Sequence, residues 1–186
     1  MRARADAALA TADRIVAAGR RRFGERDYDD VTLESISEDA GVTVQTLLRR
    51  FGSKEGLVRA ISDTVTPQVV SHRDTTPVGD VDGAVRVLVE HYEQVGDEAL
   101  HLLRQEHRVA PFAQITEIGR TYHAAWVDRT FAPWLAARTG VARARLHAQL
   151  LTTCDVQTWN LLRRQVGLSR RQTEIALAEL VNGVLR

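Results

Sequence analysis

The feature that most constrains the fold of this chain is a series of three helix N-caps in close succession, at Thr32, Thr43 and Ser53. A Ser or Thr side chain at such a position accepts a hydrogen bond from one of the unpaired backbone N–H groups of the first helical turn. The sequence therefore predicts two short helices, over about 32–40 and 43–51, and a third helix that begins after Ser53.

Apolar residues are spaced so that the two short helices pack against each other across a turn at Gly41, where glycine suits the left-handed backbone of a helix end. These residues are Leu33, Ile36, Ala40, Val42, Leu47 and Phe51. Two short helices joined in this way form a helix-turn-helix, whose second helix can enter the major groove of DNA.

The rest of the chain shows helical periodicity and no sustained alternation of β-branched residues, so the expected fold class is all-α. The other predicted helices cover about 6–24, 54–65 with a possible extension to 72, 81–95, 97–108, 112–137, 141–165 and 169–185. Pro133 predicts a kink or an end near Thr130, and Ser169 is the expected cap of the last helix.

A loop-like stretch at about 67–81 marks the expected domain boundary. It separates a head of residues 1–66, which carries the helix-turn-helix at about 32–51, from a larger helical body of residues 67–186. Within the head, Arg20-Arg21-Arg22 could follow phosphates, although a solvated helix end is the favoured interpretation. Arg2 and Arg4 could form a minor-groove arm, but a disordered tail is favoured.

The composition, with 44% hydrophobic and 26% charged residues, is that of an ordinary globular protein. No apolar run is long enough for a membrane span, and the N-terminus lacks an apolar signal core, so the cytoplasm is the expected compartment. A single cysteine, Cys154, excludes an intramolecular disulfide and a cysteine-based zinc site, and is interpreted as a buried small residue.

No catalytic or metal-binding pattern is present in the sequence. It contains no glycine-rich phosphate loop and no G-x-S-x-G motif, and its six histidines include no pair spaced i, i+4 on one helix. The formal net charge of +1 gives no indication of a nucleic-acid partner by itself. The sequence therefore predicts neither an enzyme nor a bound metal or cofactor.

The second helix of the motif offers side chains suited to DNA. Its N-terminal tip, from which side chains reach base edges, consists of Thr43, Val44, Gln45 and Thr46. Gln45 can pair with an adenine edge through two hydrogen bonds, whereas Thr43 uses its hydroxyl as the cap. Arg49 and Arg50 follow one turn later, where they can reach phosphates, and Lys54 adds a positive charge at the start of the next helix.

Residues 11–60 resemble the DNA-binding region of the TetR family of transcriptional regulators. The matching positions are Ile15, Ala17, Ala18, Phe23, Tyr28, Thr32, Ile36, Ala40, Gly41, Val42, Thr46, Leu47, Phe51, Lys54 and Leu57. The resemblance implies that double-stranded DNA is contacted by Thr32, Thr43, Gln45, Thr46, Arg49, Arg50 and Lys54.

Two positions depart from the family pattern. Leu48 stands where the family commonly has an aromatic residue that touches a phosphate, and Val44 stands where a basic or small residue is frequent. Arg49 and Arg50 could replace the missing phosphate contact, and Val44 could meet a thymine methyl group. Val44 and Leu48 are therefore kept among the candidate DNA-binding residues.

The resemblance also implies a homodimer whose body binds a small-molecule effector and thereby changes the spacing of the two heads. Release of a repressor from a near-palindromic operator is the favoured outcome, and activation stays open. The implied dimer contacts, on the last two helices, are Leu146, Leu150, Leu161, Leu177, Leu180, Val181 and Val184. The candidate effector pocket, for which a plain core role is an equal alternative, comprises Tyr92, Ile115, Ile118, Tyr122, Trp126 and Trp159.

Two rival interpretations belong to other functional classes. A helical protein–protein adaptor would keep the same head but show no salt-dependent affinity for DNA. A ligand-carrying or enzymatic helical domain would need turnover, which the missing catalytic motifs argue against.

Overall fold

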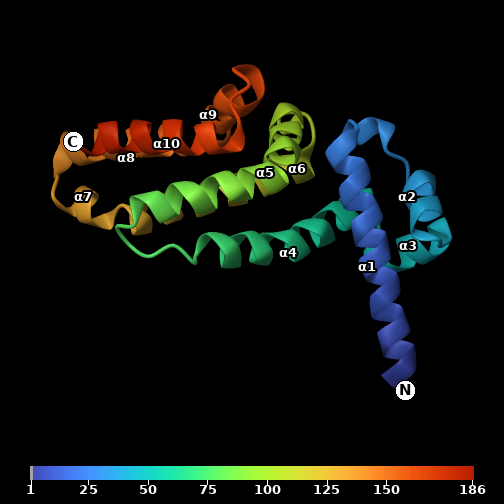
Figure 1. The fold of residues 1–186 in the computed structure, drawn as a ribbon. Helices are drawn as coiled ribbons and strands as arrows, with labels where there is room; N and C mark the ends of the chain where they lie inside the picture. The colour runs from blue at the N-terminus through green and yellow to red at the C-terminus, as the bar shows by residue number, and fades with distance from the viewer. Residues whose placement is uncertain (1) are drawn as a thin grey trace. The chain divides into compact units, whose positions relative to one another are not determined.

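The computed structural model describes residues 2–186, with side chains from residue 6 onward, and in this range the chain is helical without a strand (Figure 1). Its helices are α1 (Arg2–Glu25), η1 (Tyr28–Asp30), α2 (Leu33–Ala40), α3 (Val44–Phe51), α4 (Lys54–Arg73), α5 (Val81–Gln105), α6 (Ala110–Thr130), α7 (Ala132–Ala136), α8 (Gly140–Thr153), α9 (Val156–Asn160), η2 (Leu161–Gln165) and α10 (Arg170–Leu185). The all-α prediction is confirmed.

The side chains of Arg2 and Arg4, the candidates for an arm or tail, lie outside the described residues. None of the described helices is both long and apolar enough to cross a membrane.

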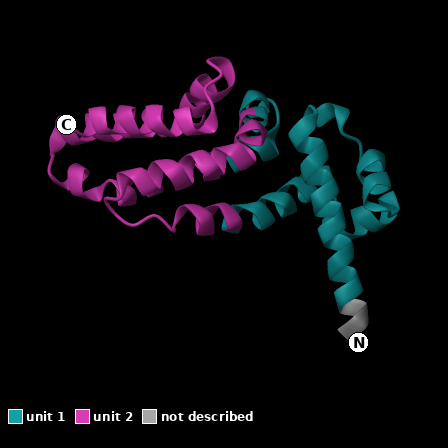
Figure 2. Cartoon of the chain, viewed as in Figure 1, with its two compact units in different colours: residues 1–67, 101–116 teal, residues 68–100, 117–186 magenta. Residues whose placement is uncertain are grey.

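The chain forms two compact units (Figure 2). We call them the head unit, residues 1–67 and 101–116, and the body unit, residues 68–100 and 117–186. The head unit therefore includes a segment, 101–116, that lies far along the chain from the helix-turn-helix. As a result, α4, α5 and α6 each belong partly to one unit and partly to the other.

The predicted caps of the head unit are confirmed. The hydroxyl of Thr32 accepts a hydrogen bond from the backbone N–H of Ser35, and that of Thr43 accepts one from Thr46. Ser53 accepts a hydrogen bond from the N–H of Gly56 at 3.1 Å. Gly41 ends α2 with a φ of 64°, a left-handed conformation that disfavours a side chain.

Helix α4 takes the longer of the two predicted lengths and continues through Pro67 to Arg73. A proline inside a helix leaves the carbonyl four residues earlier, here that of Asp63, without its backbone partner. Both Pro67 and Asp63 are exposed, so water can satisfy that carbonyl. The predicted loop therefore starts later than expected, after Arg73.

Helix α5 is continuous from Val81 to Gln105, and the predicted break at Gly96 is wrong. The ring of Trp159 packs against the backbone of Gly96 and leaves no room for a Cβ atom there. This glycine therefore serves the close approach of a neighbouring segment, and the helical hydrogen bonds continue through it.

The predicted helix over 112–137 ends at Thr130, as Pro133 indicated, and Pro133 lies in the first turn of α7. The predicted single helix over 141–165 is wrong, because α8 ends at Thr153 and a new helix starts after Asp155. The carboxylate of Asp155 accepts a hydrogen bond from the N–H of Gln157 at 2.8 Å, so this residue acts as an N-cap. Ser169 caps α10 as predicted.

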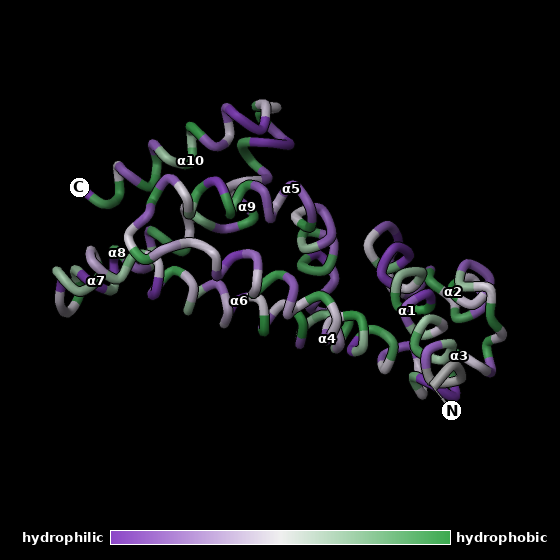
Figure 3. The backbone as a smooth tube through the Cα atoms, turned by 60° about the horizontal axis from the view of Figure 1, so that its bottom comes forward, coloured by the Kyte–Doolittle hydropathy of each residue, from purple (hydrophilic) through white to green (hydrophobic). Residues whose placement is uncertain are grey.

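The body unit is held together by buried apolar side chains, and hydrophobic and hydrophilic residues alternate along its helices (Figure 3). Helix α8 packs against α10, and Leu150 and Leu177 are fully buried. Trp126 and Phe131 meet edge to face with their ring centres 6.0 Å apart. These contacts fix the helices that carry the aromatic residues of the body unit.

Candidate nucleic-acid interface

The position of α3 is set by the core of the head unit. Leu47 is fully buried and points from the middle of α3 into a cluster of residues from α1, α2, α4 and α6. The buried members of this cluster are Ile15, Ala18, Phe23, Val31, Ile36, Ala40, Leu47, Leu57, Val58, Val109 and Phe112. Because Leu47 faces inward, the opposite side of α3 faces outward.

The outward side of α3 carries most of the predicted DNA contacts. Gln45 and Arg49 are exposed and, four residues apart, share one face of the helix with exposed Leu48. Arg50 is exposed as well, whereas Val44 lies half-buried on the side of Leu47. The face can therefore present an amide, an apolar side chain and guanidinium groups to a groove.

Two of the predicted contact residues are engaged with each other at the tip of α3. The hydroxyls of Thr43 and Thr46 lie 3.0 Å apart and form a hydrogen bond, in addition to the capping bond between Thr43 and the backbone N–H of Thr46. Thr46 therefore offers its methyl group more freely than its hydroxyl. Thr32, the remaining contact predicted on α2, is exposed at the N-terminus of that helix.

The arginines of the head unit divide into paired and unpaired groups. Arg21 and Arg22 form ion pairs with Asp39 at 2.8 and 2.7 Å, and this pairing holds the pKa of the Asp39 carboxyl well below its usual range. The ion pairs of Arg21 and Arg22 with Asp39 therefore join α1 to α2. Arg49 and Arg50, in contrast, have no carboxylate partner among the described residues, so their charges are available to phosphates.

Lys54 lies at the start of α4, but its ammonium group is engaged inside the head unit. Nζ donates a hydrogen bond to the backbone carbonyl of Tyr28 and lies 4.0 Å from the centre of the Tyr28 ring. Partial burial lowers the pKa of Lys54. The residue therefore supports the loop that precedes α2, and a phosphate contact would compete with this role.

Residues 101–116 also support the loop before α2, which no pattern in the sequence indicated. Arg108 forms ion pairs with Asp27 and Asp29 at 2.7 and 2.6 Å. The backbone N–H of Tyr28 donates to Oε1 of Gln105 at 2.8 Å. These partners are about eighty positions apart in the sequence, and no local pattern could have linked them.

The sequence model described as "Bacterial regulatory proteins, tetR family" matches residues 15–61, which span the end of α1, the helix-turn-helix and the start of α4. Residues 15–61 therefore form a DNA-binding domain of the TetR type. The resemblance that the sequence suggested is therefore confirmed.

Solved structures of transcriptional regulators share the fold of nearly the whole chain. A regulator from Rhodococcus sp. Rha1 superposes with a TM-score of 0.72 at 15% identity, covering 94% of this chain and 95% of that one. Salmonella enterica GusR gives a TM-score of 0.68 at 20% identity, covering 94% and 95%. A tetR-family regulator from Streptomyces coelicolor gives 0.67 at 15%, covering 94% and 79%. None of the curated proteins matches the chain in sequence.

The six residues predicted for the effector pocket differ in their burial and in the side chains that they contact. Tyr92 and Trp159 are buried with their ring centres 5.9 Å apart. The rings of Tyr122 and Trp126 both lie near the guanidinium of Arg73, with their centres 5.4 and 4.2 Å from its central carbon. The other two residues of the prediction are placed differently: Ile115 packs against the core of the head unit, and Ile118 is 49% exposed.

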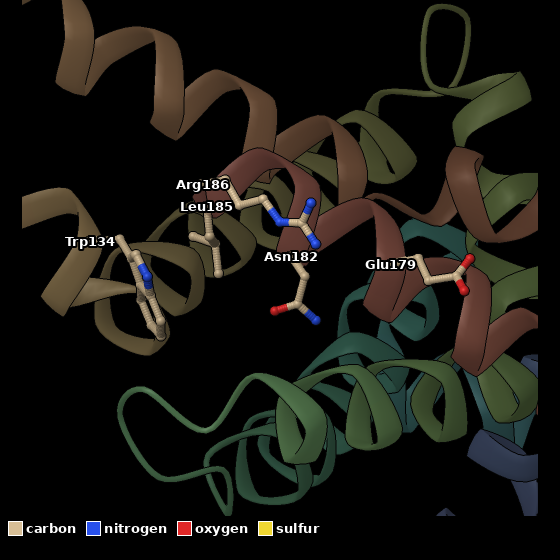
Figure 4. Close-up of a pocket in the computed structure, with 5 residues that line it drawn as sticks. All are labelled: Trp134, Glu179, Asn182, Leu185 and Arg186. Atoms are coloured by element: carbon tan, nitrogen blue, oxygen red, sulfur yellow. The ribbon is translucent and has the colours of Figure 1, made fainter.

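A surface pocket of about 470 Å³ lies at the end of α10 in the body unit (Figure 4). It is lined by Trp134, Glu179, Asn182, Leu185 and Arg186. None of the six residues predicted for the effector pocket lines it. Its walls combine polar and apolar side chains from α10, the C-terminal Arg186 and the ring of Trp134 from α7.

The predicted dimer-contact residues divide into two sets. Those already buried within one chain are Leu146, Leu150, Leu177 and Val181. Leu161 and Leu180 are about half exposed, and Val184 is half-buried. Exposed Ile175 and Val141, which the prediction did not include, add apolar surface on α10 and α8. The side chains left for a partner are therefore those on the outer sides of these helices.

Proposed function

We propose that this TetR-family regulator is a homodimeric repressor, which leaves a near-palindromic operator when a small-molecule effector binds its body. The observation that carries the DNA-binding part is the exposed face of α3, where Gln45, Arg49 and Arg50 are presented around the buried anchor Leu47. Only the first turn of such a helix reaches base edges, which gives Gln45 the leading role in sequence readout.

The homodimer is supported by the apolar side chains on the outer sides of α8 and α10. Val141, Ile175 and Leu180 are exposed in the single chain, and exposed side chains of this size gathered on two helices favour a protein partner. A two-fold pair of chains presents two copies of α3, which explains the expectation of a near-palindromic operator.

The effector part is supported by the helices that run through both units. Helices α4, α5 and α6 each have residues in the head unit and in the body unit. A ligand that displaces the body-unit part of any of these helices acts on a helix that continues into the head. Such a ligand lowers the affinity for DNA only if it binds the DNA-free arrangement of the protein more tightly than the DNA-bound one.

DNA binding is tested by titrating the full chain against random duplex DNA and against its own upstream region at two salt concentrations. We expect affinity to fall steeply with salt, because phosphate contacts release counterions. Arg49→Ala should lower the salt slope by about one unit, whereas Arg86→Ala, an exposed arginine of α5, should not. Salt-independent or undetectable binding would favour an adaptor protein and contradict the proposal.

A further inference from the structure

Arg73, the last residue of α4, is only 3% exposed in the body unit. Its guanidinium carbon lies 4.2 Å from the centre of the Trp126 ring and 5.4 Å from that of Tyr122. Nη2 donates to Nδ1 of His123 at 3.1 Å, whereas Nε has no hydrogen-bond partner. A permanently charged side chain is thus enclosed with a donor unused.

The nearby carboxylates are committed to other groups. Asp74 forms an ion pair with Arg129 at 2.7 Å and accepts a hydrogen bond from the hydroxyl of Tyr122 at 2.9 Å. Asp155 caps the N-terminus of α9. Across the part of the chain that the structure describes, no carboxylate forms an ion pair with Arg73.

The titratable side chains that face Arg73 are electrically neutral at physiological pH. Burial and the charge of Arg73 lower the pKa of His91 to about 3 and that of His123 to about 4. Burial raises the pKa of the Cys154 thiol to about 12 and also raises that of Tyr92. None of these groups can supply a negative charge, so the guanidinium of Arg73 is uncompensated.

Enclosing an unpaired charge is costly, and folds avoid it unless an anion completes the site. We propose that Arg73 anchors a binding site for a small organic carboxylate in the body unit. This inference rests on the proposed function, because it names the chemical class of the effector.

The site favours a monocarboxylate with an apolar remainder. A guanidinium offers parallel N–H groups that match the two oxygens of a carboxylate, and its single charge matches a single negative charge. A phosphate dianion would bring a second charge that no facing side chain compensates. The buried rings of Trp126 and Tyr122 make the surroundings of Arg73 apolar, which suits an apolar ligand body.

Because Arg73 is the last residue of α4, a ligand bound to it can also affect the head unit. Helix α4 begins at Lys54, whose ammonium group holds the backbone of Tyr28 in the head unit, and ends at Arg73. A carboxylate that draws Arg73 away from His123 therefore acts on the end of the helix that directly follows the helix-turn-helix.

The test measures thermal unfolding of the full chain with acetate, hexanoate and benzoate, at constant ionic strength and pH 7.5. Benzamide serves as the uncharged analogue of benzoate, and sodium phosphate as the inorganic anion. We expect at least one carboxylate to raise Tm saturably, by about 5–10 °C at about 100 times its Kd. Benzamide and phosphate should give no saturable rise. Absence of a saturable rise with all three carboxylates, or an equal rise with phosphate, would overturn the assignment.

Two variants locate the effect. Arg73→Met should abolish the carboxylate-dependent rise, and without ligand its Tm should equal or exceed that of the wild type because a buried unpaired charge is removed. Arg86→Met, on the exposed side of α5, should keep the full rise. A ligand-free Tm of Arg73→Met well below that of the wild type would show that the guanidinium is kept for stability, and so would contradict a ligand role.

A DNA titration of the ligand-free wild type separates this inference from the proposed function. Salt-dependent DNA binding without carboxylate stabilisation would refute the carboxylate site and leave the DNA-binding regulator intact. Carboxylate stabilisation of a chain that does not bind DNA would support the site and refute the regulator.

Discussion

The ring of Trp159 lies against Gly96 so closely that a Cβ atom on Gly96 would be 2.5 Å from Cζ3 of the ring. The same indole donates from Nε1 to Glu93 at 3.1 Å and lies 4.7 Å from the guanidinium carbon of Arg164. Gly96 and Glu93 are both on α5, so this indole holds α9 against that helix.

Gly96→Ala should therefore lower the free energy of unfolding, even though alanine is the better helix former. Overpacking costs about 1–3 kcal/mol, which outweighs a propensity gain of about 1 kcal/mol at most. The measurement is urea unfolding followed by circular dichroism. Gly119→Ala on α6, where nothing lies within 4 Å of the added Cβ, is the matched control and should be neutral or stabilising. Equal effects at the two glycines would refute the packing role of Gly96.

Gln105→Ala should destabilise the head unit by about 1–3 kcal/mol, because it leaves the backbone N–H of Tyr28 without its acceptor. Hydrogen exchange should show faster exchange at the Tyr28 amide, and urea unfolding should show the loss of stability. Gln114→Ala, an exposed glutamine on α6, should stay within about 0.5 kcal/mol of the wild type. Unchanged exchange at Tyr28 would contradict the supporting role of residues 101–116.

Stability should fall as the pH drops from about 6.5 towards 4. The pKa of His91 is lowered to about 3 and that of His123 to about 4, from 6.5 in the unfolded chain. The unfolded state therefore binds more protons in this window, and the contribution to stability is complete above pH 6.5. We expect a loss of up to about 2 kcal/mol per histidine between pH 7 and pH 5.

Urea midpoints at the two pH values check this expectation. His123→Gln should reduce the pH dependence, whereas replacing exposed His107 by Asn should leave it unchanged. A wild-type midpoint that is the same at pH 7 and pH 5 would show that the two buried histidines are not held neutral.

Gln45→Ala should relax the base preference at one or two positions per half-site and spare the affinity for random DNA. Gln45 is exposed on the first turn of α3, and its amide can discriminate an adenine by about 1–3 kcal/mol. Selection from randomised operators measures the preference for wild type and variant. Arg49→Ala provides the contrast, since it should weaken all sequences alike. Identical selected sequences for wild type and Gln45→Ala would place base readout elsewhere.

Leu180→Arg should shift the chain towards a monomer of 20.7 kDa at micromolar concentration. Leu180 is 46% exposed in the single chain, so the substitution should not disturb the fold, but a partner would have to enclose an unpaired charge. Sedimentation velocity measures the association state, with Gln94→Arg on the exposed side of α5 as the charge control. A wild-type monomer at this concentration would refute the dimer.

The head could be predicted closely because its signals are local. The caps at Thr32 and Thr43 bond to backbone groups three residues further along, and Gly41 needs only its own backbone conformation. The candidate DNA-contact face followed from the spacing of Leu47 and Gln45 on one helix. Sequence alone also placed Ser169 at the start of α10, for the same reason.

The tertiary structure decided what depends on residues distant in the sequence. From the sequence, Gly96 suggests a helix break, whereas the structure shows that Trp159 occupies the space beside it. Residues 101–116 likewise suggest a part of the body, whereas the ion pair between Arg108 and Asp27 joins them to the head unit. From the sequence, Arg73 is a charged residue at the end of a helix, and only its burial near the Trp126 and Tyr122 rings shows that its charge lacks a partner. A cap or a turn is a short-range interaction that the chain encodes within a few residues. Packing and compensation of charge depend on which segments meet in space.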